Sequence, residues 1–425
     1  KFPEYDNPIT EEPLLKRPNS TSTIITIFKE VECTSWNLIL TSNYIPPKEN
    51  KKWSKIIFDM KITENGTQYD RYGAFWIGGL EILRTTTAEP TSGGIEWNVE
   101  KDLTEYTSYL LQSNIATLSI PNNVDSTYTG IPLVTITLTF YEVDEFNPSP
   151  LIEPEIYPLT NSPGDWSSMS VTNNSSLIYQ VKLPLSNDVM KVELEMMASP
   201  HGCEEFWYTN IDNNTLASEL GLCGGGVYRE IQVYVDSYLA GTLNPNFVLY
   251  TGGINPYLWR PLTGIMSFDI PPYRFDLSPF MLTNGKEHTI ELHVDGGDLQ
   301  GGVWYLDGSL IIYHNSSLAP ITGEFIEAYD SGSIIETTNN LSNEGYSWIT
   351  TGSRNYSTKG IFYTNANNNN AKEEPIEYIV KGSVKTSISN LLTDSASVQL
   401  TSGSFRSVEF IESHNEKINN EVLFP

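Results

Sequence analysis

Carboxylates, aromatic rings and a guanidinium gather in three short stretches of the chain, at positions 68–72, 200–208 and 250–261. These residue types can serve acid–base chemistry and the binding of polar ligands. A carboxyl group held beside apolar surface has its pKa raised, which suits proton transfer near neutral pH. Each stretch therefore predicts a candidate site, and each also has a purely structural interpretation.

The first stretch places Asp70 at the start of the apolar run GAFWIGG. A carboxylate at this point is carried by a rigid strand near the rim of a sheet. Because successive strand side chains point to opposite faces, Asp70 and Arg71 are not expected to face each other. The alternative interpretation is a turn cap or a structural ion pair.

The second stretch has two adjacent carboxylates, Glu204 and Glu205, followed by the three aromatic residues Phe-Trp-Tyr. If this stretch is a strand, one glutamate faces the aromatic side and the other faces away. The residues alone do not decide which one. A solvated acidic edge above a core is the alternative.

The third stretch is a loop shaped by glycine and proline that carries Trp259 and Arg260. Indole and phenol rings stack on sugar faces, and a guanidinium donates hydrogen bonds in a fixed fork. These residues predict a polar, sugar-sized ligand. A packed Ω-loop is the alternative.

The elements that position these residues are predicted to be strands. Apolar or alternating runs rich in Ile, Val, Thr and Tyr occupy 22–31, 52–63, 72–83, 133–143, 176–183, 189–198, 228–241, 288–294, 303–314, 375–387 and 395–411. The best helix candidate is 102–111. Short strands without helical crossovers favour antiparallel sandwiches or jelly rolls.

Length and charge limit the function classes. The chain has 425 residues, enough for about two to four domains. Asp and Glu number 52 against 25 Lys and Arg, which gives a net charge of -27. Such a surface repels phosphate, so we expect no nucleic-acid partner and no membrane insertion. The acidity also favours a working pH below neutral.

Cysteine and histidine usage argues against metal chemistry. Cys203 and Cys223 could close one loop, with Cys33 buried as a small apolar residue. No C-x-x-C pair or H-E-x-x-H motif occurs, and His288 and His293 lie on opposite faces of a predicted strand. We therefore predict no metal site and no cofactor.

The polar residues indicate an extracellular or secreted location, with a vacuolar or other acidic compartment as the alternative. The first ten residues do not read as a signal peptide, so either processing has removed one or the chain never had one; a secreted location predicts the processed form. Eight N-x-[ST] sequons occur, beginning at Asn19, Asn65, Asn173, Asn174, Asn213, Asn315, Asn340 and Asn355.

The three stretches resemble the peptide:N-glycosidase A family of glycan amidases, and more remotely peptide:N-glycosidase F. The segments that carry the resemblance are QYDRYGAFWIGGLEILRTTTAEPTSGGIEW, KDLTEYTSYL, HGCEEFWYTN, YREIQVYVDSYLAG and YTGGINPYLWRPLTGIMSFDIPPYRFDLSPF. They cover about residues 50–300 in family order.

The resemblance implies an all-β fold of two adjacent antiparallel eight-stranded jelly-roll sandwiches with a C-terminal β extension. The expected ranges are 1–155 for the N-terminal jelly roll, 156–320 for the second, and 321–425 for a β-rich region that completes or follows it. The active site is expected where the two jelly rolls meet.

The resemblance also implies residue roles. Asp70 aligns with the essential catalytic carboxylate, and Arg260 aligns with an arginine of the cleft. Glu205, rather than Glu204, aligns with the second catalytic glutamate. The position of a third acidic residue is filled here by Asn123. The expected substrate-binding residues are Trp259, Trp207, Glu204, His201 and Glu89.

The implied activity is hydrolysis of the amide between an asparagine side chain and the proximal N-acetylglucosamine. The substrate would be an N-glycosylated peptide or glycoprotein, and the protein is expected to act as a monomer. The alternatives are a lectin-like binding protein or an endo-acting glycoside hydrolase.

Overall fold

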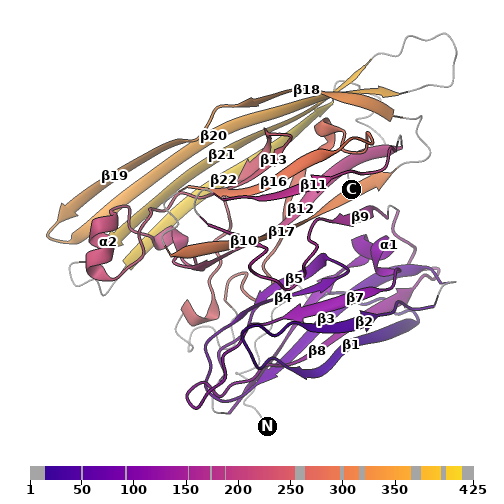
Figure 1. The fold of residues 1–425 in the computed structure, drawn as a ribbon, viewed down its shortest axis with the longest axis horizontal. Helices are drawn as coiled ribbons and strands as arrows, with labels where there is room; N and C mark the ends of the chain where they lie inside the picture. The colour runs from indigo at the N-terminus through magenta and orange to yellow at the C-terminus, as the bar shows by residue number, and fades with distance from the viewer. Residues whose placement is uncertain are drawn as a thin grey trace. The chain divides into compact units, whose positions relative to one another are not determined.

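The computed structural model describes residues 15–413 apart from ten gaps. The gaps are 49–50, 91–92, 152, 173–174, 187, 254–263, 297–300, 315–320, 365–374 and 394–398. The described chain is built from strands, every described pairing is antiparallel, and the fold is all-β as predicted (Figure 1).

The chain divides into two compact units. The first unit comprises 1–168, 248–272 and 307–311, and the second comprises 169–247, 273–306 and 312–425. The ranges expected from the sequence were contiguous, whereas each of these units is assembled from separate segments. Two of the candidate stretches, 68–72 and the described part of 250–261, belong to the first unit.

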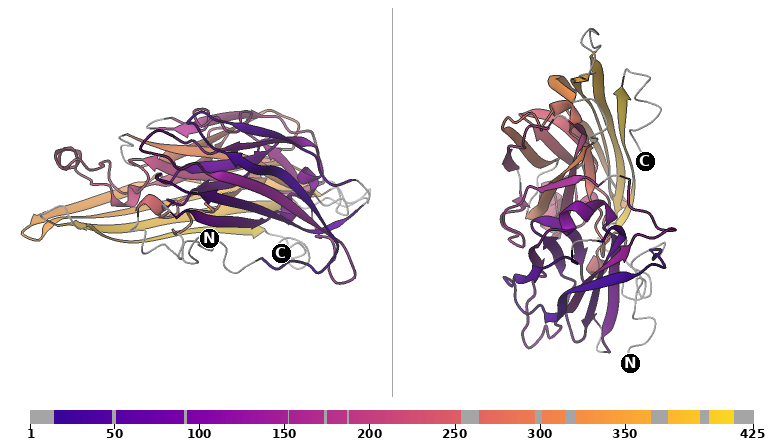
Figure 2. Two further views of the ribbon diagram at one scale, coloured as in Figure 1. Left: turned by 90° about the horizontal axis from the view of Figure 1, so that it is seen from below. Right: turned by 90° about the vertical axis from the view of Figure 1, so that its right-hand side faces the viewer.

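The first unit contains two four-stranded sheets. One has the order β1 (Ser22–Glu32), β8 (Leu133–Glu142), β3 (Trp53–Glu64), β6 (Ile95–Asp102). The other has the order β2 (Leu40–Tyr44), β7 (Asn114–Ser119), β4 (Tyr72–Ile77), β5 (Leu80–Thr86). The strand β9 (Glu155–Pro158) belongs to the same unit. Figure 2 shows these strands, indigo to magenta, from two further directions.

The two sheets of the first unit pack face to face. The ring of Phe75 on β4 stacks on Phe58 of β3 at 5.5 Å and meets Phe28 of β1 edge-on at 6.3 Å. Strand β8 shows why the sequence adopts this arrangement. Its inward Val, Ile, Leu and Phe side chains are buried and its threonines are half-buried, which is the period-two pattern of a strand with one face on the core.

The second unit begins with two further sheets. The main path of one is β10 (Ser170–Val171), β17 (Gly302–His314), β12 (Val189–Gly202), β15 (Tyr273–Asp276). The other is β11 (Leu177–Val181), β16 (His288–Asp295), β13 (Glu230–Val235), β14 (Tyr238–Leu243). They pack closely, because a Cβ added to Gly241 of β14 would lie 2.5 Å from the ring of Phe275 on β15.

A third sheet covers the second one within this unit. Its strands are β18 (Ile321–Asp330), β20 (Gly345–Thr364), β21 (Ile376–Leu392) and β22 (Gln399–Ser413), and β19 (Ile334–Ser342) also pairs with β20. Tyr238 contacts Phe325 at 4.9 Å, and Arg354 forms a buried ion pair with Glu230 at 3.0 Å. Figure 1 shows this sheet as the orange-to-yellow layer beside β13 and β16.

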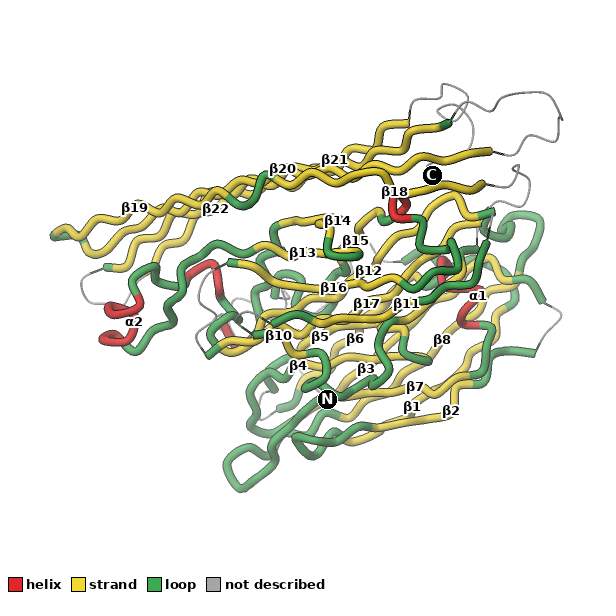
Figure 3. Tube along the Cα trace, turned by 45° about the horizontal axis from the view of Figure 1, so that its top comes forward, coloured by secondary structure: helices red, strands yellow, loops and turns green. Residues whose placement is uncertain are grey.

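The described helices are short and connect strands (Figure 3). They are α1 (Thr107–Leu110) and α2 (Asn214–Leu220), together with the 3-10 turns η2 (Thr104–Tyr106), η3 (Trp207–Thr209), η4 (Thr251–Gly253) and η5 (Ser278–Phe280). The helix expected over 102–111 is therefore reduced to η2 and α1. In the described chain, no helix is long and apolar enough to cross a membrane.

Candidate active site

Asp70 lies directly before β4 in the first unit and is half-buried. The backbone N–H of Gly252 and the hydroxyl of Thr251 hydrogen-bond to its carboxylate. Burial raises the pKa of Asp70, and these donors and Arg71 offset part of the rise. The result is a carboxylate that is oriented by fixed donors and is a stronger base than an exposed aspartate.

Gly252 is the residue that lets this carboxylate approach the backbone. A Cβ added to Gly252 would lie 2.3 Å from Oδ1 of Asp70, which is far inside van der Waals contact. The hydroxyl of Thr251 also lies 2.9 Å from the carbonyl oxygen of Thr87, so its one proton is shared between this oxygen and the carboxylate of Asp70. The 251–252 backbone is thus fastened to the strand region beside Asp70. We call Thr251, Gly252 and Thr87 the Asp70 cradle.

The hydrogen bonds of Arg71 go to residues other than Asp70. Its backbone N–H donates to Oγ1 of Thr87 at 2.8 Å, and the N–H of Thr87 donates to its carbonyl at 2.7 Å. Its guanidinium donates to Oε1 of Gln68 at 2.5 Å and to Oδ1 of Asn122 at 3.3 Å. The side chain is therefore positioned by uncharged oxygens, and its charge acts on its surroundings without a hydrogen-bonded carboxylate.

The two other first-unit candidates differ in environment. Glu89 is half-buried in the segment after β5. Asn123 is exposed, and its side-chain amide donates to Asp125 at 3.4 Å. Trp259 and Arg260 lie outside the described residues, as does the rest of 254–263.

The Cys203–Phe206 segment in the second unit is a turn, so strand alternation does not decide between Glu204 and Glu205. Strand β12 ends at Gly202, whose φ of 65° takes the chain out of the extended region. The N–H of Glu205 donates to the carbonyl of Gly202 at 3.0 Å. A disulfide joins Cys203 to Cys223, and the free Cys33 is buried.

Glu204 is fully buried and makes a complete set of charge-assisted hydrogen bonds. Arg229 donates to its two oxygens at 2.5 and 2.6 Å, and the indole N–H of Trp304 donates to Oε2 at 3.0 Å. Such a bidentate pair fixes both partners. Glu204 is committed to the interior of its own unit, so the expected substrate contact by Glu204 is not supported.

Glu205 is half-buried. Its charge, together with the larger effect of burial, raises the pKa of Tyr208. Of the two adjacent glutamates, Glu204 is therefore the one that forms a fully buried ion pair with Arg229, whereas Glu205 lies nearer the surface.

Trp207 and His201 are both core residues. The indole of Trp207 is 0% exposed and packs against Tyr208 and Phe247 at 5.7 and 5.3 Å. A fully buried ring offers no face to a sugar, so the structure contradicts the expected stacking platform at Trp207. The His201 ring is buried, bonds to Ser199 at 2.8 Å and lies against Tyr305 at 4.7 Å.

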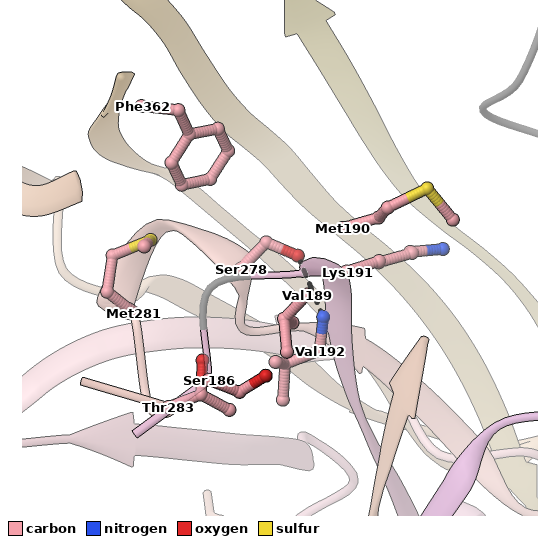
Figure 4. Close-up of a pocket in the computed structure, with 9 residues that line it drawn as sticks. All are labelled: Ser186, Val189, Met190, Lys191, Val192, Ser278, Met281, Thr283 and Phe362. Carbon is pink, nitrogen blue, oxygen red and sulfur yellow. Dashed lines mark hydrogen bonds between the residues drawn. The ribbon is translucent and has the colours of Figure 1, made fainter. Parts of the chain in front are cut away.

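A surface pocket of the second unit contains none of these candidates (Figure 4). It is lined by Ser186, Val189, Met190, Lys191, Val192, Ser278, Met281, Thr283 and Phe362. The hydroxyl of Ser278 is engaged there by the N–H of Val192 at 3.1 Å. Among the described residues, no group of three or more His, Cys, Asp or Glu side chains is arranged to hold a metal ion.

Comparison with known proteins identifies the family to which the chain belongs. Residues 11–331 match the family described as peptide N-acetyl-beta-D-glucosaminyl asparaginase amidase A. The chain belongs to this family, and the prediction from its motifs is confirmed.

A particular relative is the peptide-N4-(N-acetyl-beta-glucosaminyl)asparagine amidase A of Prunus dulcis. It is 33% identical over 341 residues, which cover 75% of this chain and 59% of the relative. The chain thus spans well under two thirds of that relative's length.

Solved structures of similar proteins include a peptide-N(4)-(N-acetyl-beta-D-glucosaminyl)asparagine amidase, at 12% identity and a TM-score of 0.49. The match covers 71% of this chain and 98% of that one. Another is PNGF-II, at 15% identity and a TM-score of 0.47, covering 69% and 65%.

Several supporting residues were not found from the sequence. They are Thr251, Gly252, Arg229 and Trp304, which hold Asp70 or Glu204. One signal was available, because a buried carboxylate requires a cation and the strand segment YREIQVYV offers one arginine. No local pattern links Gly252 to Asp70, which is 182 positions away in the chain.

Proposed function

We propose that this chain is a glycoamidase that hydrolyses the bond between the asparagine side chain and the proximal N-acetylglucosamine of N-glycans. The reaction converts asparagine to aspartate and releases a glycosylamine. The observation that carries the proposal is the family match over residues 11–331, which includes the carboxylate with its own cradle, Asp70.

Asp70 is proposed to activate the attacking water or to attack the amide carbonyl itself. A base must be correctly oriented and must have a pKa suited to proton transfer. The Gly252 N–H and the Thr251 hydroxyl supply the orientation, and burial raises the pKa of Asp70. Both requirements are met by residues of the first unit alone.

Glu205 is proposed to hold the water or to protonate the leaving nitrogen. Its neighbour Glu204 would fix the turn through Arg229 and so keep Glu205 in position. Arg260 is proposed to polarise the carbonyl or to bind the sugar, and Trp259 to stack on it. Glu89 and His201 are proposed to contact the substrate on the basis of the sequence alone.

The finer features of the fold and setting are also proposals. We propose that each unit contains an eight-stranded jelly roll. The two four-stranded sheets of the first unit support this, as do the four strands on the main path of each of the first two sheets of the second unit. We further propose a monomer that acts in an extracellular or secreted setting and needs no metal or cofactor. The net charge of -27 favours a working pH below neutral.

One experiment tests the activity against both alternatives. The chain is incubated with a defined N-glycopeptide, and the peptide product is weighed by mass spectrometry. Conversion of asparagine to aspartate supports the amidase. A residual N-acetylglucosamine on the peptide supports an endo-acting glycoside hydrolase, and an unchanged glycopeptide that is retained by the protein supports a lectin-like protein.

A second experiment tests whether Asp70 and Glu205 serve one reaction. The rate constant kcat is measured for Asp70→Asn, Glu205→Gln and the double variant. Residues that act together in one step show strongly non-additive losses. A double variant no slower than Asp70→Asn supports the proposal, and a loss equal to the product of the two single losses contradicts it.

A further inference from the structure

The last residue of β3, Glu64, is a buried carboxyl group without a hydrogen-bond partner. Its side chain is 3% exposed, and within the described structure neither Oε1 nor Oε2 meets a donor. Burying an unpaired carboxylate is costly, and the usual outcome is that the group takes up a proton. Glu64 lies six positions before Asp70 in the same unit.

The surroundings of Glu64 belong to the segment that leads to Asp70. A Cβ on Gly130 would lie 2.7 Å from Oε1 of Glu64 and 2.7 Å from Cβ of Gln68, so these groups are tightly packed. The amide of Gln68 donates to the carbonyls of Asn123 and Gly130 at 3.0 and 3.3 Å. Gln68 in turn accepts from the guanidinium of Arg71 at 2.5 Å.

Arg71 acts electrostatically on two carboxyl groups. Its positive charge lowers the pKa of Glu64 and also that of Asp70, although burial outweighs it and leaves both raised. Its N–H groups, however, bond to Gln68 and Asn122. One cation is therefore shared by two carboxyl groups and is hydrogen-bonded to neither.

Few other titratable groups face Glu64. On the β1 side, burial and the nearby Glu64 raise the pKa of the Cys33 thiol to about 12, so this group stays neutral. The residue opposite Glu64 on β6 is Ile95. The pair of Lys61 and Glu96 is about half exposed, with side-chain exposures of 50% and 40%, and alternation places Lys61 on the opposite face of β3 from Glu64.

We propose that Glu64 is a positioning residue for the reaction at Asp70. When Glu64 is neutral, the positive charge of Arg71 acts mainly on the carboxylate of Asp70. When Glu64 is ionised, it attracts the Arg71 guanidinium away from Gln68 and Asn122. Burial raises the pKa of Glu64 to about 8, so this change falls in mild alkali. The inference rests on the proposed glycoamidase function.

The test compares pH profiles of the wild-type chain and Glu64→Gln on one glycopeptide. The neutral glutamine mimics the protonated acid. We expect similar kcat values at pH 6, a wild-type kcat that falls by up to about tenfold per pH unit above pH 8, and a variant that keeps its activity there. Glu96→Gln, at the partly exposed carboxylate paired with Lys61, is the matched control and should behave as wild type. The same alkaline fall in Glu64→Gln and wild type would overturn the inference.

A second measurement does not depend on activity or on the folding of a variant. The Nε–H signal of Arg71 is followed by NMR of the wild-type chain during a pH titration. We expect the signal to move with a midpoint near pH 8, because Glu64 ionises there. A signal that does not move between pH 6 and 10 overturns the inference even if the amidase is active. A moving signal in an inactive chain supports the Glu64 coupling while the proposed function fails.

Discussion

The two candidate regions hold their carboxylates by opposite means. In the first unit, Asp70 is half-buried and is oriented by a backbone N–H and a hydroxyl, and among the described residues the nearby Arg71 hydrogen-bonds to Gln68 and Asn122 instead. In the second unit, Glu204 is fully buried and is neutralised by the bidentate Arg229.

This difference separates a reactive carboxylate from a structural one. A carboxylate paired with arginine is stabilised in its ionised form and makes a poor base, whereas one bound by neutral donors stays oriented and available. Residue type and sequence position alone do not distinguish the two cases. Their partners do, and each prediction below removes one partner or one carboxylate.

The largest effect is expected for Asp70→Asn. The amide keeps the shape of the side chain and still accepts the Gly252 N–H, but it takes no proton. We expect kcat on a glycopeptide to fall by about 10³-fold or more, near the upper end for a lost proton-transfer group. The measurement is kcat with the melting temperature as control. A variant within tenfold of wild type would exclude Asp70 as the base.

The next effect separates the adjacent glutamates. We expect Glu205→Gln to lower kcat by at least about 10²-fold with an unchanged melting temperature. Glu204→Gln leaves Arg229 buried without its counter-charge, which typically costs about 3–5 kcal/mol of stability. Urea unfolding and kcat are measured for both. A stable, inactive Glu204→Gln beside an active Glu205→Gln would reverse the two roles.

A smaller effect is expected for Gly252→Ala, which alters the shape of the Asp70 cradle without changing any charge. The added Cβ would lie 2.3 Å from Oδ1 of Asp70, so the carboxylate must move. A misplacement of about 1 Å costs on the order of 10²-fold in rate. We expect kcat to fall to this extent. Thr251→Ser keeps the hydroxyl and is the matched control; an equal loss in both variants would show that the cradle does not act through the glycine.

The strand content was predictable because it follows from local patterns. In β8 and β16, apolar and polar residues alternate along the sequence. Both strands were predicted to within about one residue at each end. The runs 72–83 and 228–241 were each expected as one strand but are hairpins. Tight turns at Gly78–Gly79 and Asp236–Ser237, with positive φ, divide them.

The strands β18 to β20 were not predicted, because their residue types show no regular alternation of apolar and polar side chains. In β20 the burial does alternate, but Thr350, Arg354 and Thr358 are among its buried residues. All nine residues of β19 are exposed, and its sequence IIETTNNLS shows no regular alternation. Pairing with β20 supplies its order instead. The candidate site follows the same rule. Asp70 and Glu205 are proposed from family motifs, whereas the partners that position Asp70 come from chain positions that only the fold brings together.

Reducing the disulfide should weaken the second region and leave the first unchanged. The bond joins residues 20 positions apart, and a loop of that length contributes about 3 kcal/mol by restricting the unfolded chain. We expect a lower melting temperature for Cys223→Ser and a reduced kcat, because Cys203 lies two residues before Glu205. The variant Cys33→Ser is the control, because it replaces the buried free cysteine of the first unit without breaking a disulfide. Equal stability in Cys223→Ser and wild type would contradict the prediction.

The smallest effect is a gain in stability when Asp70 is made neutral. Burial raises the folded-state pKa of Asp70 above its ordinary value of 3.8, so the wild-type chain loses stability as the pH rises through the folded pKa. Asp70→Asn does not titrate and keeps that stability. The variant should therefore match wild type below about pH 3.8 and exceed it near neutral pH by about 0.5–2 kcal/mol, the usual size of such a gain. The check is the free energy of unfolding of both chains at several pH values. Asp276→Asn is the contrasting control, because Tyr378 and Ser278 donate to the two oxygens of that buried carboxyl, and an amide keeps only one of these acceptors. A constant difference between Asp70→Asn and wild type at all pH values would mean that Asp70 has an ordinary pKa, and the contrast between the two regions would then rest on geometry alone.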